Sequence, residues 1–124
     1  PPHFPAAFYG VFHDFDRNRA FDIFNRSCSA ESGRALCEIG FPYFFSPSPT
    51  DINAEGIKCP TLIIGAGRDR ITPVQISKKL KKKLGERSEL IIFKKFSHYI
   101  MEGEEFSTIF QYIVKWIKKN RNNP

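Results

Sequence analysis

The chain has 124 residues, of which 41% are hydrophobic and 26% are charged, and its formal net charge is +6. This length suits one ordinary domain, and this balance of apolar and charged residues excludes an intrinsically disordered chain. Three cysteines without CxxC spacing support neither a disulfide framework nor a zinc site, so we expect no bound metal.

The sequence also argues against a membrane protein. No run approaches the roughly 18–20 consecutive apolar residues that a membrane span needs. No charged start followed by an apolar core marks a secretory signal, so we expect a cytoplasmic protein with no membrane partner. The chain opens on Pro1 without a methionine, which predicts that it is a piece of a longer protein.

The positive charge is concentrated in the second part of the chain. Residues 1–50 carry four arginines and five acidic residues, a net −1, whereas residues 51–124 carry fifteen basic and eight acidic residues, a net +7. Much of the excess is one lysine run at 78, 79, 81, 82 and 83. The pattern favours a solvated helix face over a polyanion site, and we expect no nucleic-acid partner.

The first 50 residues are rich in phenylalanine and predict short helices without a strand. Nine of the 13 phenylalanines lie within the first 45 residues. One predicted helical stripe consists of Ala20, Phe21, Phe24 and Cys28. A second short helix follows residues 31–34, has Ala35, Leu36 and Ile39 on one side, and closes at Gly40 and Pro42. Apolar faces of this width must cover something else.

Residues 59–93 predict a strand, a helix and a second strand. The run Thr61–Ala66 and the run Leu90–Phe93 are typical of strands buried on both faces. Thr72, Pro73 and Gln75 fit a capping box, and Gly85 fits the helix end. The helix should bury a stripe formed by Ile76, Leu80 and Leu84.

A final amphipathic helix should pack on the sheet. It is expected to begin at Glu104 and Glu105 and to end at Lys118 and Lys119. Its apolar face consists of Phe106, Ile109, Phe110, Ile113, Trp116 and Ile117. The fold class is therefore α/β, a parallel strand–helix–strand–helix unit. Two strands cannot form an independent sheet, so we expect a removed N-terminal half or a second chain to complete it, with dimerisation (a homodimer) or aggregation when the chain is isolated.

Two side chains that could carry chemistry follow the two predicted strands. Asp69 comes after the first and His98 after the second, 29 residues later. The carboxyl ends of parallel strands meet at one sheet edge, where open α/β sheets bind ligands. Asp16 and Asp51 lack a preceding buried strand, and His3 and His13 lack a comparable setting. No phosphate-binding glycine loop is evident, and no cofactor is expected.

The order and spacing of these residues resemble the C-terminal end of an α/β-hydrolase. The loop Gly65–Pro73 resembles the loop that carries the catalytic acid of that family, Ile57–Gly65 resembles the strand that precedes it, and His98 follows the last strand. The resemblance implies that residues 1–50 form a helical lid or cap, 51–58 a connector, and 59–124 the C-terminal part of the core. It also implies that Asp69 is the catalytic acid and His98 the general base of a catalytic triad.

The chain departs from the family pattern in three places. Ser97 stands where the family usually has glycine, and Asp69 lies between Arg68 and Arg70, which either pair with lid acids or substrate or face solvent. No serine lies in a G-x-S-x-G elbow. We therefore expect the C-terminal half of an esterase-like serine hydrolase, acting on a small apolar ester-like substrate, with its nucleophile in a missing N-terminal half. The alternative is a non-catalytic binding protein of the same fold.

Overall fold

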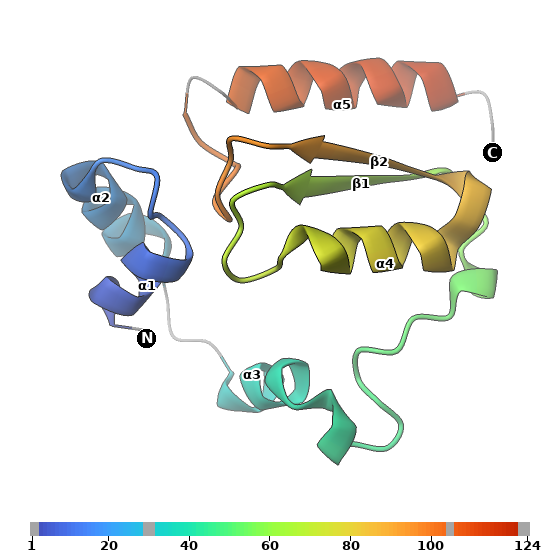
Figure 1. Cartoon of the computed structure of the whole chain (residues 1–124), viewed down its shortest axis with the longest axis horizontal. Helices are drawn as coiled ribbons and strands as arrows, with labels where there is room; N and C mark the ends of the chain where they lie inside the picture. The colour runs from blue at the N-terminus through green and yellow to red at the C-terminus, as the bar shows by residue number, and fades with distance from the viewer. Residues whose placement is uncertain (1–2, 29–31, 104–105, 122–124) are drawn as a thin grey trace.

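A computed structural model describes residues 3–28, 32–103 and 106–121. Three helices precede a two-stranded sheet, and two further helices accompany the sheet (Figure 1). The helices are α1 (Phe4–Gly10), α2 (Arg17–Ser27), α3 (Gly33–Gly40), α4 (Val74–Leu84) and α5 (Phe106–Asn120), and the strands are β1 (Thr61–Ala66) and β2 (Ser88–Phe93). Short 3-10 turns occur at Pro42–Phe44, Ala54–Gly56 and Gly85–Arg87.

The sheet is parallel, as the sequence predicts. β1 pairs with β2 from Thr61 opposite Ser88 to Ala66 opposite Phe93. The crossover helix α4 packs against both strands, and Figure 1 shows α4 and α5 on opposite sides of them. The expected α/β class is confirmed at this level: a small parallel strand pair with helices on two sides. None of the helices within the described residues is long and apolar enough to cross a bilayer.

The two strands are less buried than the sequence predicts. In β1 only Ile63, Gly65 and Ala66 are buried, and in β2 only Ser88 is. The described part of the chain forms a sheet of just these two strands, so each strand keeps one edge without a partner strand. Strands of this apolar content bury both faces only inside a wider sheet, which explains the difference.

Helix α4 corrects two expectations and confirms a third. The predicted capping box is wrong, because Pro73 is the N-cap residue without a side-chain cap bond and the Thr72 hydroxyl donates to Asp69 Oδ2 instead (2.7 Å). The stripe is also not buried, since Ile76 is 52% exposed and no residue of α4 is fully buried. Gly85, with φ +67°, does end the helix.

The lysines of α4 do more than cover a solvated face. Lys81 Nζ donates to the carbonyl oxygens of Gly85 and Ser88. Lys83 Nζ forms an ion pair with Asp51 at 2.8 Å, which attaches the helix to the connector. The remaining lysines of the run, at 78, 79 and 82, are exposed.

Helices α1 and α2 form a small core of their own. Its buried members are Ala7, Phe12, Ala20 and Ile23. The predicted stripe on α2 is therefore partly wrong: Ala20 is buried and Phe24 packs on this core, but Ile23 replaces Phe21 and Cys28, which are exposed. Asp16 caps α2 by accepting from the backbone N–H groups of residues 18 and 19.

The third and fifth helices leave much apolar surface open. Ser32 caps α3, but Ile39 on that helix is exposed. On α5, Ile109 is buried whereas Phe110 and Ile117 are exposed. Tyr112 ties α5 to β2, because its hydroxyl donates to Glu89 Oε1 at 2.6 Å. The predicted start of α5 at Glu104 and Glu105 lies outside the described residues.

Candidate active site

The two predicted site residues lie on loops that leave the same edge of the sheet. Asp69 follows β1, and His98 follows β2. Hydrogen bonding between the loops continues beyond the strands: Gly67 N–H donates to the Phe93 carbonyl, and Arg68 N–H donates to the Phe96 carbonyl, both at 2.9 Å. Parallel pairing and these two bonds bring the carboxylate and the imidazole together.

The close approach of the two loops requires a glycine at position 67. A Cβ at Gly67 would lie 2.6 Å from both the Cα and the carbonyl oxygen of Lys94. Those are backbone atoms, so they cannot rotate away as the end of a side chain could. Glycine is the residue that permits such an approach, and here it sets the distance between the acid loop and the histidine loop.

Asp69 and His98 form a hydrogen-bonded acid–base pair. His98 Nδ1 lies 3.0 Å from Asp69 Oδ2 and 3.1 Å from Oδ1. The Asp69 side chain is 7% exposed, whereas the His98 side chain is 36% exposed. The structure therefore places the carboxylate inside and leaves part of the imidazole open, which is the arrangement an orienting acid and a working base need.

Asp69 is held by a dense set of donors from its own loop. Its Oδ1 accepts from the backbone N–H groups of Ile71 and Thr72, each at 2.8 Å, and its Oδ2 accepts from the Thr72 hydroxyl at 2.7 Å. Burial alone would raise the pKa of this carboxyl. The bonds from Thr72, His98 and Ile71 outweigh burial, so the pKa lies below the ordinary value of 3.8.

This protonation state decides the tautomer of His98. An ionised carboxylate can only accept hydrogen bonds, so the Nδ1 atom of His98 carries the proton in the bond to Asp69. In the neutral imidazole the lone pair then lies on Nε2. The pair is thereby set for His98 to take up a proton at Nε2, with Asp69 stabilising the positive charge that results.

The chain neighbours of the pair contact the segment Tyr9–Asp14, which the sequence did not reveal. Arg70 donates from Nη1 to the Tyr9 carbonyl at 3.0 Å, and its guanidinium lies 4.5 Å from the centroid of the Tyr9 ring. Arg70 thus binds a backbone carbonyl of the N-terminal segment, and Arg68 is exposed. Ser97 N–H donates to Asp14 Oδ2 at 2.9 Å. No local sequence motif around Asp14 indicated that it would bind the histidine loop.

His13 lies close enough to the site for the charged groups there to change its pKa. Its Nδ1 is buried without a hydrogen-bond partner among the described residues. Burial lowers the pKa of His13 below 6.5, as do the charges of Arg70 and Arg68, against the opposing effect of Asp14 and Asp69. His3, by contrast, is exposed and precedes α1.

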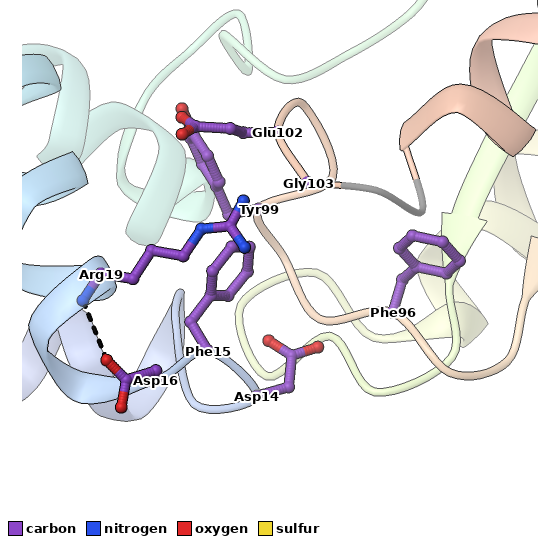
Figure 2. Close-up of a pocket in the computed structure, with 8 residues that line it drawn as sticks. All are labelled: Asp14, Phe15, Asp16, Arg19, Phe96, Tyr99, Glu102 and Gly103. Carbon is purple, nitrogen blue, oxygen red and sulfur yellow. Dashed lines mark hydrogen bonds between the residues drawn. The ribbon is translucent and has the colours of Figure 1, made fainter.

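A pocket of about 260 Å³ lies between the α1–α2 region and the loop that follows β2 (Figure 2). Two of its residues, Phe96 and Tyr99, flank Ser97 and His98 in the chain, whereas neither Asp69 nor His98 lines it. Aromatic rings and charged groups share the lining, which comprises Asp14, Phe15, Asp16, Arg19, Phe96, Tyr99, Glu102 and Gly103. Glu102 is already paired with Arg26 at 3.0 Å.

The chemistry available at this site is proton transfer. No cluster of three or more histidine, cysteine or acidic side chains within the described residues could hold a metal ion. The 124 residues contain no G-x-S-x-G elbow, and the Thr72 hydroxyl is committed to Asp69. The pair can therefore serve as base and orienting acid toward a nucleophile that this sequence does not identify.

Comparisons with known proteins found no relative of this chain. No protein-family model, no curated protein and no solved structure matches the chain.

Proposed function

We propose that this chain carries the acid and base of a serine hydrolase of the α/β-hydrolase type. The complete enzyme would cleave an ester or similar acyl bond in a small apolar substrate, and its nucleophilic serine would lie outside these 124 residues. The observation that carries the proposal is the Asp69–His98 bond at the carboxyl edge of two parallel strands. The lowered pKa of Asp69 supports it, because the acid must stay ionised.

Each group has a defined task in this reaction. His98 Nε2 accepts the serine Oγ proton while Oγ attacks the substrate carbonyl carbon, and Asp69 stabilises the imidazolium that forms. His98 then donates the same proton to the alkoxide as its bond to the acyl carbon breaks. The alkoxide departs as an alcohol, and the acyl group stays bonded to the serine Oγ as the acyl-enzyme. In the second half, His98 takes a proton from water, the hydroxide attacks the acyl carbon, and the serine recovers its proton.

The pocket beside the histidine loop, which Phe96 and Tyr99 line but His98 does not, supports a small substrate with an apolar part. The rings of Phe15, Phe96 and Tyr99 face the pocket in Figure 2, and the pocket has a volume of about 260 Å³. That volume is just below the range of roughly 300–1,000 Å³ typical of ligand pockets, which favours a small substrate. The charged groups of the lining would bind the polar end of the substrate.

The test uses the complete protein that contains this chain. We expect His98→Ala to lower kcat/KM for a short p-nitrophenyl ester by about 100- to 10,000-fold, the usual contribution of a general base. Labelling of the serine by a fluorophosphonate probe should fall in parallel, because the probe needs the activated hydroxyl but no particular substrate.

His3→Ala is the matched control, since it removes an exposed histidine that precedes α1. It should leave both hydrolysis and labelling unchanged. Near-normal hydrolysis by His98→Ala would reject the assignment of the base. A complete protein that is folded but neither labelled nor active would favour the binding-protein alternative.

A further inference from the structure

The segment Tyr9–Asp14 touches both loops that carry the acid–base pair. On the acid side, Arg70 follows Asp69 directly and donates to the Tyr9 carbonyl at 3.0 Å. Gly10 packs so closely on this loop that a Cβ there would lie 2.7 Å from Ile71 Cδ1. The segment therefore contacts the two residues that immediately follow Asp69.

On the base side, the residue before His98 is held at two atoms. Ser97 N–H donates to Asp14 Oδ2 at 2.9 Å, and Ser97 Oγ donates to the Val11 carbonyl at 3.2 Å. Ser97 is 1% exposed, so water cannot replace either partner at low cost. Ser97 stands where the α/β-hydrolase pattern usually has glycine, and in this chain its hydroxyl donates to the Val11 carbonyl.

The residue after His98 is held as well. The ring of Tyr99 packs against Phe12 and Phe15, with centroid separations of 5.2 and 6.0 Å. Both chain neighbours of His98 are thus fixed by residues 11–15. A movement of the His98 backbone away from Asp69 would break these contacts, and the Asp14 bond is the one made by a charged acceptor.

We propose that Asp14 is a positioning residue for His98: its carboxylate anchors the Ser97 N–H and thereby holds the imidazole against Asp69. Asp14 does not contact the pair directly and acts through Ser97. The contribution of Asp14 to catalysis rests on the proposed function. Its effect on the geometry of the Asp69–His98 bond is independent of that function. The N-terminal helical region then holds the histidine loop in place.

The experiment compares Asp14→Ala with Asp14→Asn in the complete protein that contains this chain. Proton NMR observes the hydrogen-bonded Nδ1–H of His98, and nitrogen shifts report its tautomer. Asp14→Ala removes the acceptor, so we expect the Nδ1–H resonance to be lost and both tautomers to be populated. Asp14→Asn keeps an acceptor oxygen of the same shape, so the resonance and the tautomer should be restored.

Asp22→Ala is the control, because it makes the same substitution at an exposed position of α2. It should leave the His98 resonance in place. If Asp14→Ala remains folded and also keeps the wild-type resonance and tautomer, the proposal is overturned. If Asp14→Ala does not fold, hydrogen exchange in the wild-type chain decides: slow exchange at the Ser97 amide supports the anchor, and exchange as fast as in an exposed loop rejects it.

Activity separates this proposal from the proposed function. In the complete protein, Asp14→Ala should lower kcat because the base is misplaced, and Asp14→Asn, which keeps the acceptor oxygen, should restore it. Asp14 also lines the pocket, so a change in KM with kcat unaltered would overturn the positioning role. A wild-type protein without hydrolase activity would refute the proposed function alone. The NMR comparison would still decide the role of Asp14.

Discussion

At the scale of single residues, the site depends on how the Asp69 carboxylate is satisfied. Three donors from its own loop and the imidazole of His98 share its two oxygens. The Thr72 hydroxyl would have capped α4 on sequence grounds, and its use by Asp69 leaves that helix with Pro73 at its N-cap. The Thr72 hydroxyl thus completes the hydrogen bonding of the Asp69 carboxylate, and α4 has no side-chain cap.

Thr72→Val should weaken this site measurably. The change removes a hydroxyl donor to a nearly buried carboxylate, which should lower the free energy of unfolding by ~1–2 kcal/mol and raise the pKa of Asp69. Urea denaturation measures the first effect. Thr108→Val, an exposed threonine of α5, is the control; equal losses in the two variants would contradict the role given to the Thr72 hydroxyl.

The lowered pKa of Asp69 predicts a specific loss of stability in acid. Because this pKa is lower in the folded chain than the ordinary 3.8, the unfolded chain binds more protons in that range. The stabilisation from Asp69 is therefore complete above pH 3.8 and disappears as the pH falls through the lower folded-state pKa.

The measurement compares urea unfolding of the wild-type chain and Asp69→Asn from neutral pH to below 3.8. The wild type should lose more free energy of unfolding than Asp69→Asn, so that the two converge in acid. Asp22→Asn, at an exposed position of α2, should follow the wild type throughout. Parallel curves for the wild type and Asp69→Asn would refute the prediction.

At the scale of elements, the parallel pair β1–β2 and the two loops after it create the site. The strand–helix–strand order was predictable because two short apolar runs, Thr61–Ala66 and Leu90–Phe93, flank a lysine-rich amphipathic helix. The joining of the two loops was not, because it depends on backbone bonds such as Gly67 N–H to the Phe93 carbonyl. Backbone hydrogen bonds between loops produce no periodic pattern of residue types, so the sequence does not predict them.

Gly67→Ala should separate the two loops. Its Cβ would lie 2.6 Å from backbone atoms of Lys94, and overpacking of this kind costs ~1–3 kcal/mol. We expect that loss in urea denaturation, together with a weakened His98 Nδ1–H resonance. Gly33→Ala is the matched control, since a Cβ there meets nothing within 4 Å, and it should cause little change; an equally small loss in Gly67→Ala would disprove the close approach.

At the scale of the whole molecule, the α1–α2 core meets the histidine loop beside the site. Tyr99 from that loop packs against the core. The sheet and its helices, by contrast, leave Ile76, Phe110 and Ile117 exposed. The joint between the core and the histidine loop lies next to His98, so the packing of the N-terminal helices and the geometry of the pair are linked.

Phe12→Ala should therefore affect both stability and the site. Phe12 is 3% exposed and contacts Tyr99, and removal of a buried phenylalanine ring costs ~3–5 kcal/mol. Thermal or urea unfolding measures this loss. Phe21→Ala removes a more exposed ring of α2 and should cost much less; similar losses would show that Phe12 does not hold the joint.

The sequence by itself determined the order of strand, helix and strand and the positions of an acid and a histidine after consecutive strands. Apolar runs, a glycine helix end and single residues after each run are local patterns, and local patterns can be read without coordinates. Only the tertiary structure decided which side chain satisfies which partner: Thr72 with Asp69 rather than with the helix end, Arg70 with Tyr9, and Ser97 with Asp14. Those partners are up to 83 residues apart in the chain, and which groups meet across such a separation depends on packing.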